Sequence, residues 1–228
     1  MDDLKASRWG TPPPQLLLGD DEVHVWRAKL NARAVEVEQM IELLSRVERR
    51  EMQRSDAPKH LAAARHMVRT LLGRYLGRDP GKLKLKSAPD GRLFLAGDGA
   101  LHFDLAASGG RALFAISATQ RVAVSIDALP SADDIARRMR DVPAREARQL
   151  EFLSPQNRAH AVIGHQLERA CTERLAAAGG EPGSRIERLK VGGSFAAALS
   201  ADGWDWSPSF WRYLRPGERA ASEEDEEG

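Results

Sequence analysis

Apolar residues recur along the chain with two different periods, and these periods predict the order of strands and helices. Apolar and polar residues alternate over residues 23–30, which is typical of a strand. Over residues 36–54 apolar side chains return every three or four positions, which predicts a helical stripe with a break near Ser45. A second helix is expected from Pro58, where an early proline precedes a continuous apolar face, to a stop at Gly77.

The remainder of the chain reads as strands on both sides of a further group of helices. The expected strands are residues 82–86, 93–95, 101–105, 111–117, 121–129, 185–191 and 194–200. Helices are expected at residues 132–139, 144–152 and 155–178. The tryptophan-rich segment 204–211 is expected to pack back on the body of the protein, because leaving its indoles in water would forfeit much favourable burial.

The order strand, helix, helix, strands occurs twice, once on each side of about residue 105, so we expect an α+β protein with two halves. Residues 1–21 contain Thr-Pro-Pro-Pro and little periodicity, which predicts an extended N-terminal arm. The N-terminal half would then comprise residues 22–105 and the C-terminal half residues 106–215. The acidic segment 216–228 is expected to be disordered.

Composition and cysteine usage limit the class of protein. The chain has 228 residues, of which 42% are hydrophobic and 29% charged, as in an ordinary soluble globular protein. No run approaches the roughly 20 apolar residues of a membrane span, and the first residues lack a basic segment followed by an apolar one, so we expect a cytoplasmic protein without a membrane partner. The single cysteine, Cys171, excludes an internal disulfide and lies at helical spacing from Leu167, which indicates a core residue.

Charge is unevenly distributed, although the net charge is only +1. Residues 46–92 contain 13 Lys/Arg and 5 Asp/Glu, whereas residues 222–228 read Ser-Glu-Glu-Asp-Glu-Glu-Gly. A basic surface attracts phosphates or an acidic protein, and an arginine-rich solvated helix face has the same composition. Nucleic-acid binding is the weaker interpretation, because no aromatic–basic interleaving or helix-turn-helix signal accompanies the charge.

Seven short segments match one family in their order and spacing over about 180 residues. They are residues 21–26 (Asp-Glu-Val-His-Val-Trp), 44–50, 65–77, 89–92 (Pro-Asp-Gly-Arg), 103–110 (Phe-Asp-Leu-Ala-Ala-Ser-Gly-Gly), 122–127 (Val-Ala-Val-Ser-Ile-Asp) and 144–146 (Ala-Arg-Glu). Together they resemble the Sfp-type 4′-phosphopantetheinyl transferase superfamily, in which the fourth to sixth read Gly-Lys-Pro, Phe-Asn-Leu-Ser-His-Ser-Gly and Val-Gly-Val-Asp-Ile-Glu. The resemblance implies two pseudo-symmetric α+β halves, each a small mixed or antiparallel sheet packed with helices. Coenzyme A would lie in the cleft between the halves of a monomer.

The resemblance also implies a reaction, in which a serine of an acyl or peptidyl carrier protein attacks the β-phosphate of coenzyme A and expels 3′,5′-ADP. Mg²⁺ held on carboxylates would neutralise the phosphates. The Asp-Ile-Glu strand motif places two carboxylates on one face. Here Ser125 takes the first place and Asp127 the second, so metal binding is expected to be weak or lost.

Two other family positions also differ in this chain. The helical motif Trp-Thr-x-Lys-Glu-Ala is best matched by residues 164–169, which keep only Glu168 as the catalytic and metal-binding candidate. Glu168 is equally well read as a solvated helix residue, and Glu173 could take its place. Ala107 replaces the phosphate-binding histidine, which leaves Ser108 and the neighbouring glycine amides as donors.

The coenzyme end of the site keeps more of its basic residues. The resemblance assigns contacts with the 3′-phosphate and the adenylate to Arg49, Arg50, Lys59, His60 and Arg92. Arg65 and Arg69 lie four residues apart on one helix, where they are either salt-bridge partners or ligands. The other histidines form no metal-binding spacing and are expected to be structural.

Two functions therefore remain open on the sequence. One is an active phosphopantetheinyl transferase in which Asp127, Glu168 and Asp104 hold the ion. The other is a non-catalytic descendant that binds coenzyme A, a carrier protein or a partner enzyme. Asp104 stands where the family has asparagine, and its charge opposes anion binding. Losing the aspartate, the lysine and the histidine together favours the second function, since each removes a charge or a donor.

Overall fold

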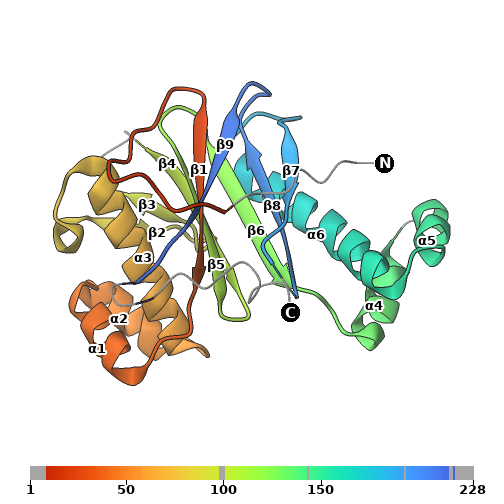
Figure 1. Ribbon diagram of the computed structural model, residues 1–228, viewed down its shortest axis with the longest axis horizontal. Coiled ribbons are helices and arrows are strands. Elements are labelled where there is room, and N and C mark those ends of the chain that lie inside the picture. The colour runs from red at the N-terminus through yellow and green to blue at the C-terminus, as the bar shows by residue number, and fades with distance from the viewer. Residues whose placement is uncertain (1–8, 98–100, 143, 193, 216–217, 219–228) are drawn as a thin grey trace.

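The computed structural model describes residues 9–97, 101–142, 144–192, 194–215 and 218. Figure 1 shows the elements in their arrangement. They are β1 (Glu22–Lys29), α1 (Ala34–Glu42), α2 (Arg46–Gln53), α3 (Pro58–Leu76), β2 (Leu85–Ser87), β3 (Leu93–Leu95), β4 (His102–Ser108), β5 (Arg111–Ser117), β6 (Val122–Ala128), α4 (Ala132–Arg138), α5 (Ala144–Glu151), α6 (Pro155–Ala177), β7 (Ile186–Leu189), β8 (Phe195–Ala201) and β9 (Ser207–Arg212), with short 3₁₀ turns η1 (Pro80–Lys82) and η2 (Met139–Asp141).

The strands form three sheets with the orders β4-β5-β1-β9, β2-β3 and β6-β8-β7. The first sheet is mixed, because β1 pairs antiparallel with β5 and parallel with β9. The third is antiparallel, with β8 between β6 and β7. These sheets and the helices beside them confirm the α+β class. No helix in the described ranges has the length and apolar character to cross a membrane.

The helices cover the sheets from two sides (Figure 1). Helices α1, α2 and α3 lie on one side, α6 lies on the other, and α4 and α5 extend outward at the far end of α6. The apolar face of α3 packs on the first sheet, where Met67 and Leu71 belong to the same buried cluster as Trp26 and Phe114. Burying large side chains of this kind contributes about 1.5–3 kcal/mol each.

Local signals in the sequence explain where the first helices begin and end. The Ser45 hydroxyl accepts a hydrogen bond from the backbone N–H of Glu48, and the Glu48 carboxylate accepts one from the backbone N–H of Ser45. This pair of hydrogen bonds is the capping box that starts α2. The predicted helix break near Ser45 is thereby confirmed. Gly77 ends α3 with a left-handed φ of 61°, as expected for a C-terminal glycine.

Two predictions about local structure are corrected. The expected strand at residues 82–86 begins only at Leu85, because the chain first forms η1, and the carbonyls of Pro80 and Leu83 accept hydrogen bonds from Arg69. The tryptophan segment packs back on the protein only in part: Trp206 is buried, whereas 66% of Trp204 is exposed.

The strand pairing bears on the division into two halves. The expected boundary after residue 105 falls within β4, and β5 pairs with both β4 and β1. Strand β9 comes from the end of the chain, yet it also pairs with β1. Residues 9–21 contain no helix or strand, and Trp9 is buried. Apart from Glu218, the segment 216–228 lies outside the described residues.

A buried ion pair links the first and third sheets. The carboxylate of Asp104, on β4, accepts hydrogen bonds from the guanidinium of Arg174, on α6, and from the backbone N–H of Val124, on β6. Only 3% of the Asp104 side chain is exposed. Burial alone would lower the pKa of Arg174, but the hydrogen bonds and charge of Asp104 raise it.

A second buried ion pair holds α2 against α3. Arg69 donates to both oxygens of Glu48 over 2.7–3.1 Å, and its side chain is 1% exposed. Of the two roles considered for Arg69, salt-bridge partner and ligand, these contacts support the salt-bridge partner. Burial raises the pKa of the Glu48 carboxyl, but hydrogen bonds from Arg69 and Ser45 outweigh this effect and hold that pKa below its usual value of 4.5.

We predict that Arg174→Met lowers the free energy of unfolding by about 3–5 kcal/mol, because it leaves the Asp104 carboxylate buried without its counter-charge. Urea denaturation measures this loss. Arg169→Met is the matched control on α6, since Arg169 forms an exposed pair with Glu173 and should cost less than about 1 kcal/mol. Equal losses in the two variants would contradict the structural role of the Asp104–Arg174 pair.

We also predict a change in acid stability for Glu48→Gln. Because the folded pKa of Glu48 is lowered, its charge stabilises the fold above the usual pKa of 4.5, and this contribution disappears as the pH falls through the folded pKa. The variant should be less stable near about pH 7 and should lose less stability than the wild type between about pH 5 and pH 2. Glu38→Gln, at an exposed position of α1, should follow the wild type in both respects.

Candidate functional site

A pocket of about 320 Å³ lies between the first half of α3 and the turn that joins β4 to β5. We call it the α3 pocket. Its walls include His60, Ala64 and Arg65 of α3 and residues 107–110 at the turn. It therefore combines a basic helix face with the donors of a glycine turn. Of the predicted coenzyme ligands, His60 and Ser108 line this pocket together.

The turn of the α3 pocket requires glycine. Gly109 and Gly110 are the two residues between β4 and β5, and their φ angles are 53° and 79°. Positive φ at both central positions defines a type I′ hairpin turn, which side chains with a Cβ adopt poorly. The turn also lies close to the β1–α1 loop: a Cβ on Gly110 would lie 2.8 Å from Oδ1 of Asn31. This turn holds Ser108 at the wall of the pocket.

Arg65 is the buried cation of the α3 pocket. Its Nη2 donates to Glu51 over 2.9 Å and to Ser87 over 3.4 Å, and 9% of its side chain is exposed. Nε and Nη1 are buried without a hydrogen-bond partner among the described residues. Burial lowers the pKa of Arg65, against the opposing effect of the Glu51 carboxylate. Buried N–H groups without an acceptor cost free energy, so Arg65 is an under-satisfied cation in the wall of the pocket.

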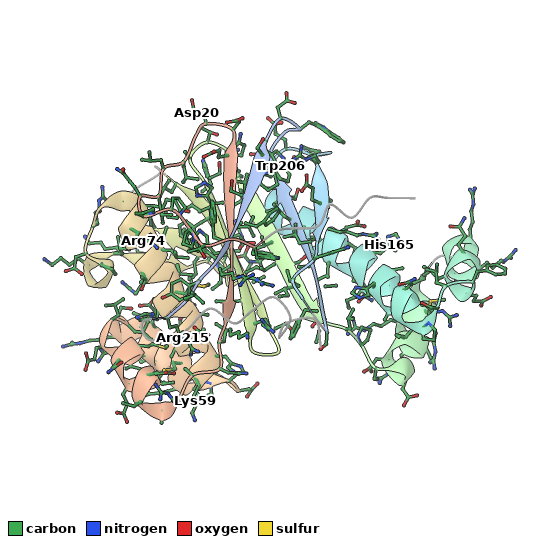
Figure 2. The ribbon with its side chains drawn as sticks, viewed as in Figure 1. Asp20, Lys59, Arg74, His165, Trp206 and Arg215 are labelled. Atoms are coloured by element: carbon green, nitrogen blue, oxygen red, sulfur yellow. The ribbon has the colours of Figure 1, made fainter. Side chains whose placement is uncertain are left out.

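A second, more open pocket of about 520 Å³ adjoins the α3 pocket. We call it the outer pocket. His60 lines both pockets, and Nε2 of His60 lies 2.8 Å from Oδ1 of Asn31. The outer pocket also has Lys59, Arg33 and Arg215 in its wall. Figure 2 shows Lys59 and Arg215 on the side of the molecule formed by α1, α2 and α3. The predicted ligand Lys59 is thus next to the α3 pocket.

Three other predicted coenzyme ligands are placed differently. Arg49 donates to the carbonyls of Leu44 and Glu42 over 3.0 and 3.1 Å, so its guanidinium caps the end of α1. Arg92 donates to Asp90 and to the carbonyl of Ala177, at the end of α6. Arg50 is exposed on α2. None of the three lines either pocket, whereas Arg65, which the sequence left undecided, does.

Ser125 faces the core of the protein. Its hydroxyl donates to the carbonyl of Leu167 over 2.8 Å, and it lies 3.2 Å from Sγ of Cys171. Cys171 is fully buried, as expected for a core residue, and burial raises the pKa of its thiol to about 12. This part of α6 packs on β8 through an apolar cluster that contains Leu167 and Cys171. The position of the family's first strand carboxylate is therefore part of the core.

The remaining acidic candidates have separate partners. Asp127 accepts a hydrogen bond from Ser108 over 2.8 Å, and 40% of its side chain is exposed. Glu168 pairs with Arg188 of β7 over 2.7 Å and lies 3.6 Å from His165. Within the described ranges, no three His, Cys, Asp or Glu side chains are grouped so that they could hold a metal ion. With Ser125 in the core and Glu168 paired to Arg188, the side chains present do not fit the Mg²⁺ that the family resemblance implies.

Asp104, which the sequence suggested as an ion ligand or as a charge near bound phosphates, has partners of its own. Its carboxylate is buried and its oxygens accept from Arg174 and Val124. The Asp104–Arg174 pair as a whole has no net charge. The guanidinium of Arg174 therefore offsets the repulsion that the Asp104 carboxylate would exert on a bound anion.

Most of the histidines have contacts away from the α3 pocket. Nδ1 of His24 lies 2.7 Å from the Tyr75 hydroxyl, and Nδ1 of His66 lies 3.3 Å from the Tyr213 hydroxyl. Burial lowers the pKa of both His24 and His66. These contacts favour the structural role expected for them. Figure 2 places His165 on α6, on the side opposite α3.

Comparison with known proteins identifies a similar transferase. The chain is 26% identical over 235 residues to the 4′-phosphopantetheinyl transferase HetI of Nostoc sp. (strain PCC 7120 / SAG 25.82 / UTEX 2576), and the match covers 90% of this chain and 98% of the relative. No protein-family model matches the chain. The α+β architecture, with mixed sheets and helices, is compatible with the fold of these transferases. This similarity along nearly the whole of both chains supports the 4′-phosphopantetheinyl transferase superfamily for this protein.

Proposed function

We propose that the protein binds coenzyme A in the α3 pocket and transfers its phosphopantetheine group to the serine of an acyl or peptidyl carrier protein. In this reaction the serine oxygen forms a bond to the β-phosphorus, the bond from that phosphorus to the bridging oxygen breaks, and 3′,5′-ADP leaves. The serine proton passes to water or to a carboxylate. The protein would act as a cytoplasmic monomer, in which the cleft is supplied by one chain.

The observation that carries this proposal is the pair of unpaired N–H groups on Arg65. An arginine with 9% of its side chain exposed lines the α3 pocket next to Ser108 and the Gly109-Gly110 turn. Leaving such groups buried without an acceptor costs free energy, which binding of a phosphate would recover. Coenzyme A has a 3′-phosphate and a pyrophosphate, so it offers anions to both walls of the pocket.

The order of strands and helices supports a two-fold arrangement of the chain into halves. Apart from β9, which joins β1 from the end of the chain, the orders β4-β5-β1 and β7-β8-β6 are equivalent, because the central strand of each, β5 or β8, is antiparallel to both of its neighbours. In each half the first strand is followed by helices that end in a long one, α3 or α6. We propose that the halves are pseudo-symmetric and that the division follows β5 rather than residue 105.

A second function is favoured by the partners of the acidic residues. Glu168, the catalytic candidate, pairs with Arg188, and Ser125 is bonded to the carbonyl of Leu167. Both positions are therefore engaged in holding the fold together. The alternative proposal is a non-catalytic protein that binds coenzyme A, a carrier protein or a partner enzyme through the same pocket.

Mass spectrometry of carrier proteins separates the two functions. The protein is incubated with coenzyme A and a panel of apo carrier proteins, with Mg²⁺ or with EDTA, and the carriers are weighed. The transferase proposal predicts the gain of one phosphopantetheine on at least one carrier. No gain across a broad panel, together with coenzyme A binding in calorimetry, would support the non-catalytic alternative instead.

We predict that Arg65→Met weakens binding of 3′,5′-ADP, because it removes the unpaired donors from the α3 pocket. Hydrogen bonds to a charged group are worth about 1.5–3 kcal/mol, which corresponds to roughly a 10- to 100-fold rise in Kd by calorimetry. Arg46→Met, which removes the same charge from an exposed position of α2, should change the Kd by less than about twofold. Equal weakening in both variants would mean that only general electrostatic attraction is at work.

A further inference from the structure

Asp127, the one carboxylate kept from the family's strand motif, accepts a hydrogen bond from a wall residue of the α3 pocket and has a basic neighbour. Nη2 of Arg138, the last residue of α4, lies 3.8 Å from Oδ2 of Asp127. This distance is longer than the roughly 2.7–2.9 Å of a charge-assisted hydrogen bond, so the pair is a loose one. The guanidinium thus lies beside Asp127, where the family resemblance would have a divalent ion.

Gln166 of α6 holds Arg138 in this place. Its Nη1 donates to Oε1 of Gln166 over 2.6 Å. About one third of the side chain, 32%, is exposed, so solvent and an incoming ligand can reach it. A guanidinium has five N–H donors in a plane, so it can keep its hydrogen bond to Gln166 and still donate one to a phosphate oxygen.

Asp127 connects Arg138 to the α3 pocket. Its other oxygen, Oδ1, accepts the hydrogen bond from Ser108, and Ser108 lines that pocket beside the Gly109-Gly110 turn. Only one carboxylate therefore separates the guanidinium from the hydroxyl and the amides that face the pocket. A pyrophosphate bound at the turn would attract Arg138 toward it and away from the loose contact with Asp127.

We propose that Arg138 serves as a built-in cation for the pyrophosphate of bound coenzyme A, in place of Mg²⁺. This inference rests on the proposed function. It follows from the poor fit of the acidic residues to a metal ion and from the presence of an arginine at the same place. Binding of coenzyme A should accordingly be independent of divalent cations.

Calorimetry with three ligands tests the inference on the intact protein. Coenzyme A, dephospho-coenzyme A and 3′,5′-ADP are titrated with EDTA and with Mg²⁺. Arg138→Gln should raise the Kd for coenzyme A and dephospho-coenzyme A about tenfold, and that for 3′,5′-ADP much less, because this ligand lacks the β-phosphate. Arg65→Met should weaken the binding of coenzyme A and of 3′,5′-ADP most. In the wild type, Mg²⁺ should change the Kd of coenzyme A by less than twofold.

Arg137→Gln is the matched control, because it removes the same charge from α4 at a residue that pairs with Asp134 and has 70% of its side chain exposed. It should bind all three ligands as the wild type does, and Arg138→Lys should regain part of the lost affinity. Urea denaturation verifies that the variants are folded. A wild type that binds coenzyme A only with Mg²⁺, or equal affinities in Arg138→Gln and Arg137→Gln, would overturn the inference and leave the proposed function standing. A wild type that binds none of the ligands would overturn both.

Discussion

The ion pair between Asp104 and Arg174 fixes how the strands beside the pocket lie relative to one another. Strands β4 and β6 belong to different sheets, so no ladder of backbone hydrogen bonds sets their register. The Asp104 carboxylate supplies the link, since it holds the N–H of Val124 on β6 and the guanidinium of Arg174 on α6. A buried carboxylate is tolerated only while these donors remain in place, and this requirement makes the arrangement specific.

The position of the pocket follows from this link. Four residues beyond Asp104, β4 ends at Ser108, and three residues beyond Val124, β6 presents Asp127. The hydrogen bond between Ser108 and Asp127 continues the contact of the two strands at their ends. The wall of the α3 pocket and its nearest carboxylate are thus placed by an interaction that lies outside the pocket. Asp104, whose charge the sequence suggested would oppose anion binding, instead helps to position the wall of the pocket.

The buried arginines of this protein differ in how many of their N–H groups have an acceptor, and their burial alone does not show this difference. Arg69 is saturated by Glu48 and two carbonyls, and Arg174 is held by Asp104 and the carbonyl of Leu105. Arg65 is buried as well, yet it keeps two N–H groups without an acceptor among the described residues. Unsatisfied donors distinguish Arg65 from Arg69 and Arg174, and the cluster of basic residues in the sequence does not reveal this difference.

The sequence predicted features that depend on neighbouring residues and missed those that depend on distant ones. The helix break near Ser45 and the stop at Gly77 were predicted, and both follow from local backbone preferences. The strand expected at residues 101–105 continues to Ser108 in β4, so the two-residue turn that follows it was not predicted. The strand at residues 82–86 was predicted too early, because Arg69 binds the carbonyls of Pro80 and Leu83 and holds them outside a sheet.

The same limit applies to the candidate site. His60 and Ser108 line the α3 pocket, but Arg49 and Arg92 point to helix ends. Side-chain direction on a known element depends on tertiary partners such as Ala177, which is 85 residues from Arg92. The spacing of Arg65 and Arg69 left two roles open for each, and only their packing distinguishes them.

We propose that the α3 pocket binds the phosphates of coenzyme A through arginine and backbone donors rather than through a metal ion. A crystal structure grown with coenzyme A and Mg²⁺ tests it most directly. We expect density for phosphates against Arg65 and the Gly109-Gly110 turn, with the Arg138 guanidinium in contact with the pyrophosphate. Nucleotide bound elsewhere, or an octahedral ion between the pyrophosphate and Asp127, would contradict the claim.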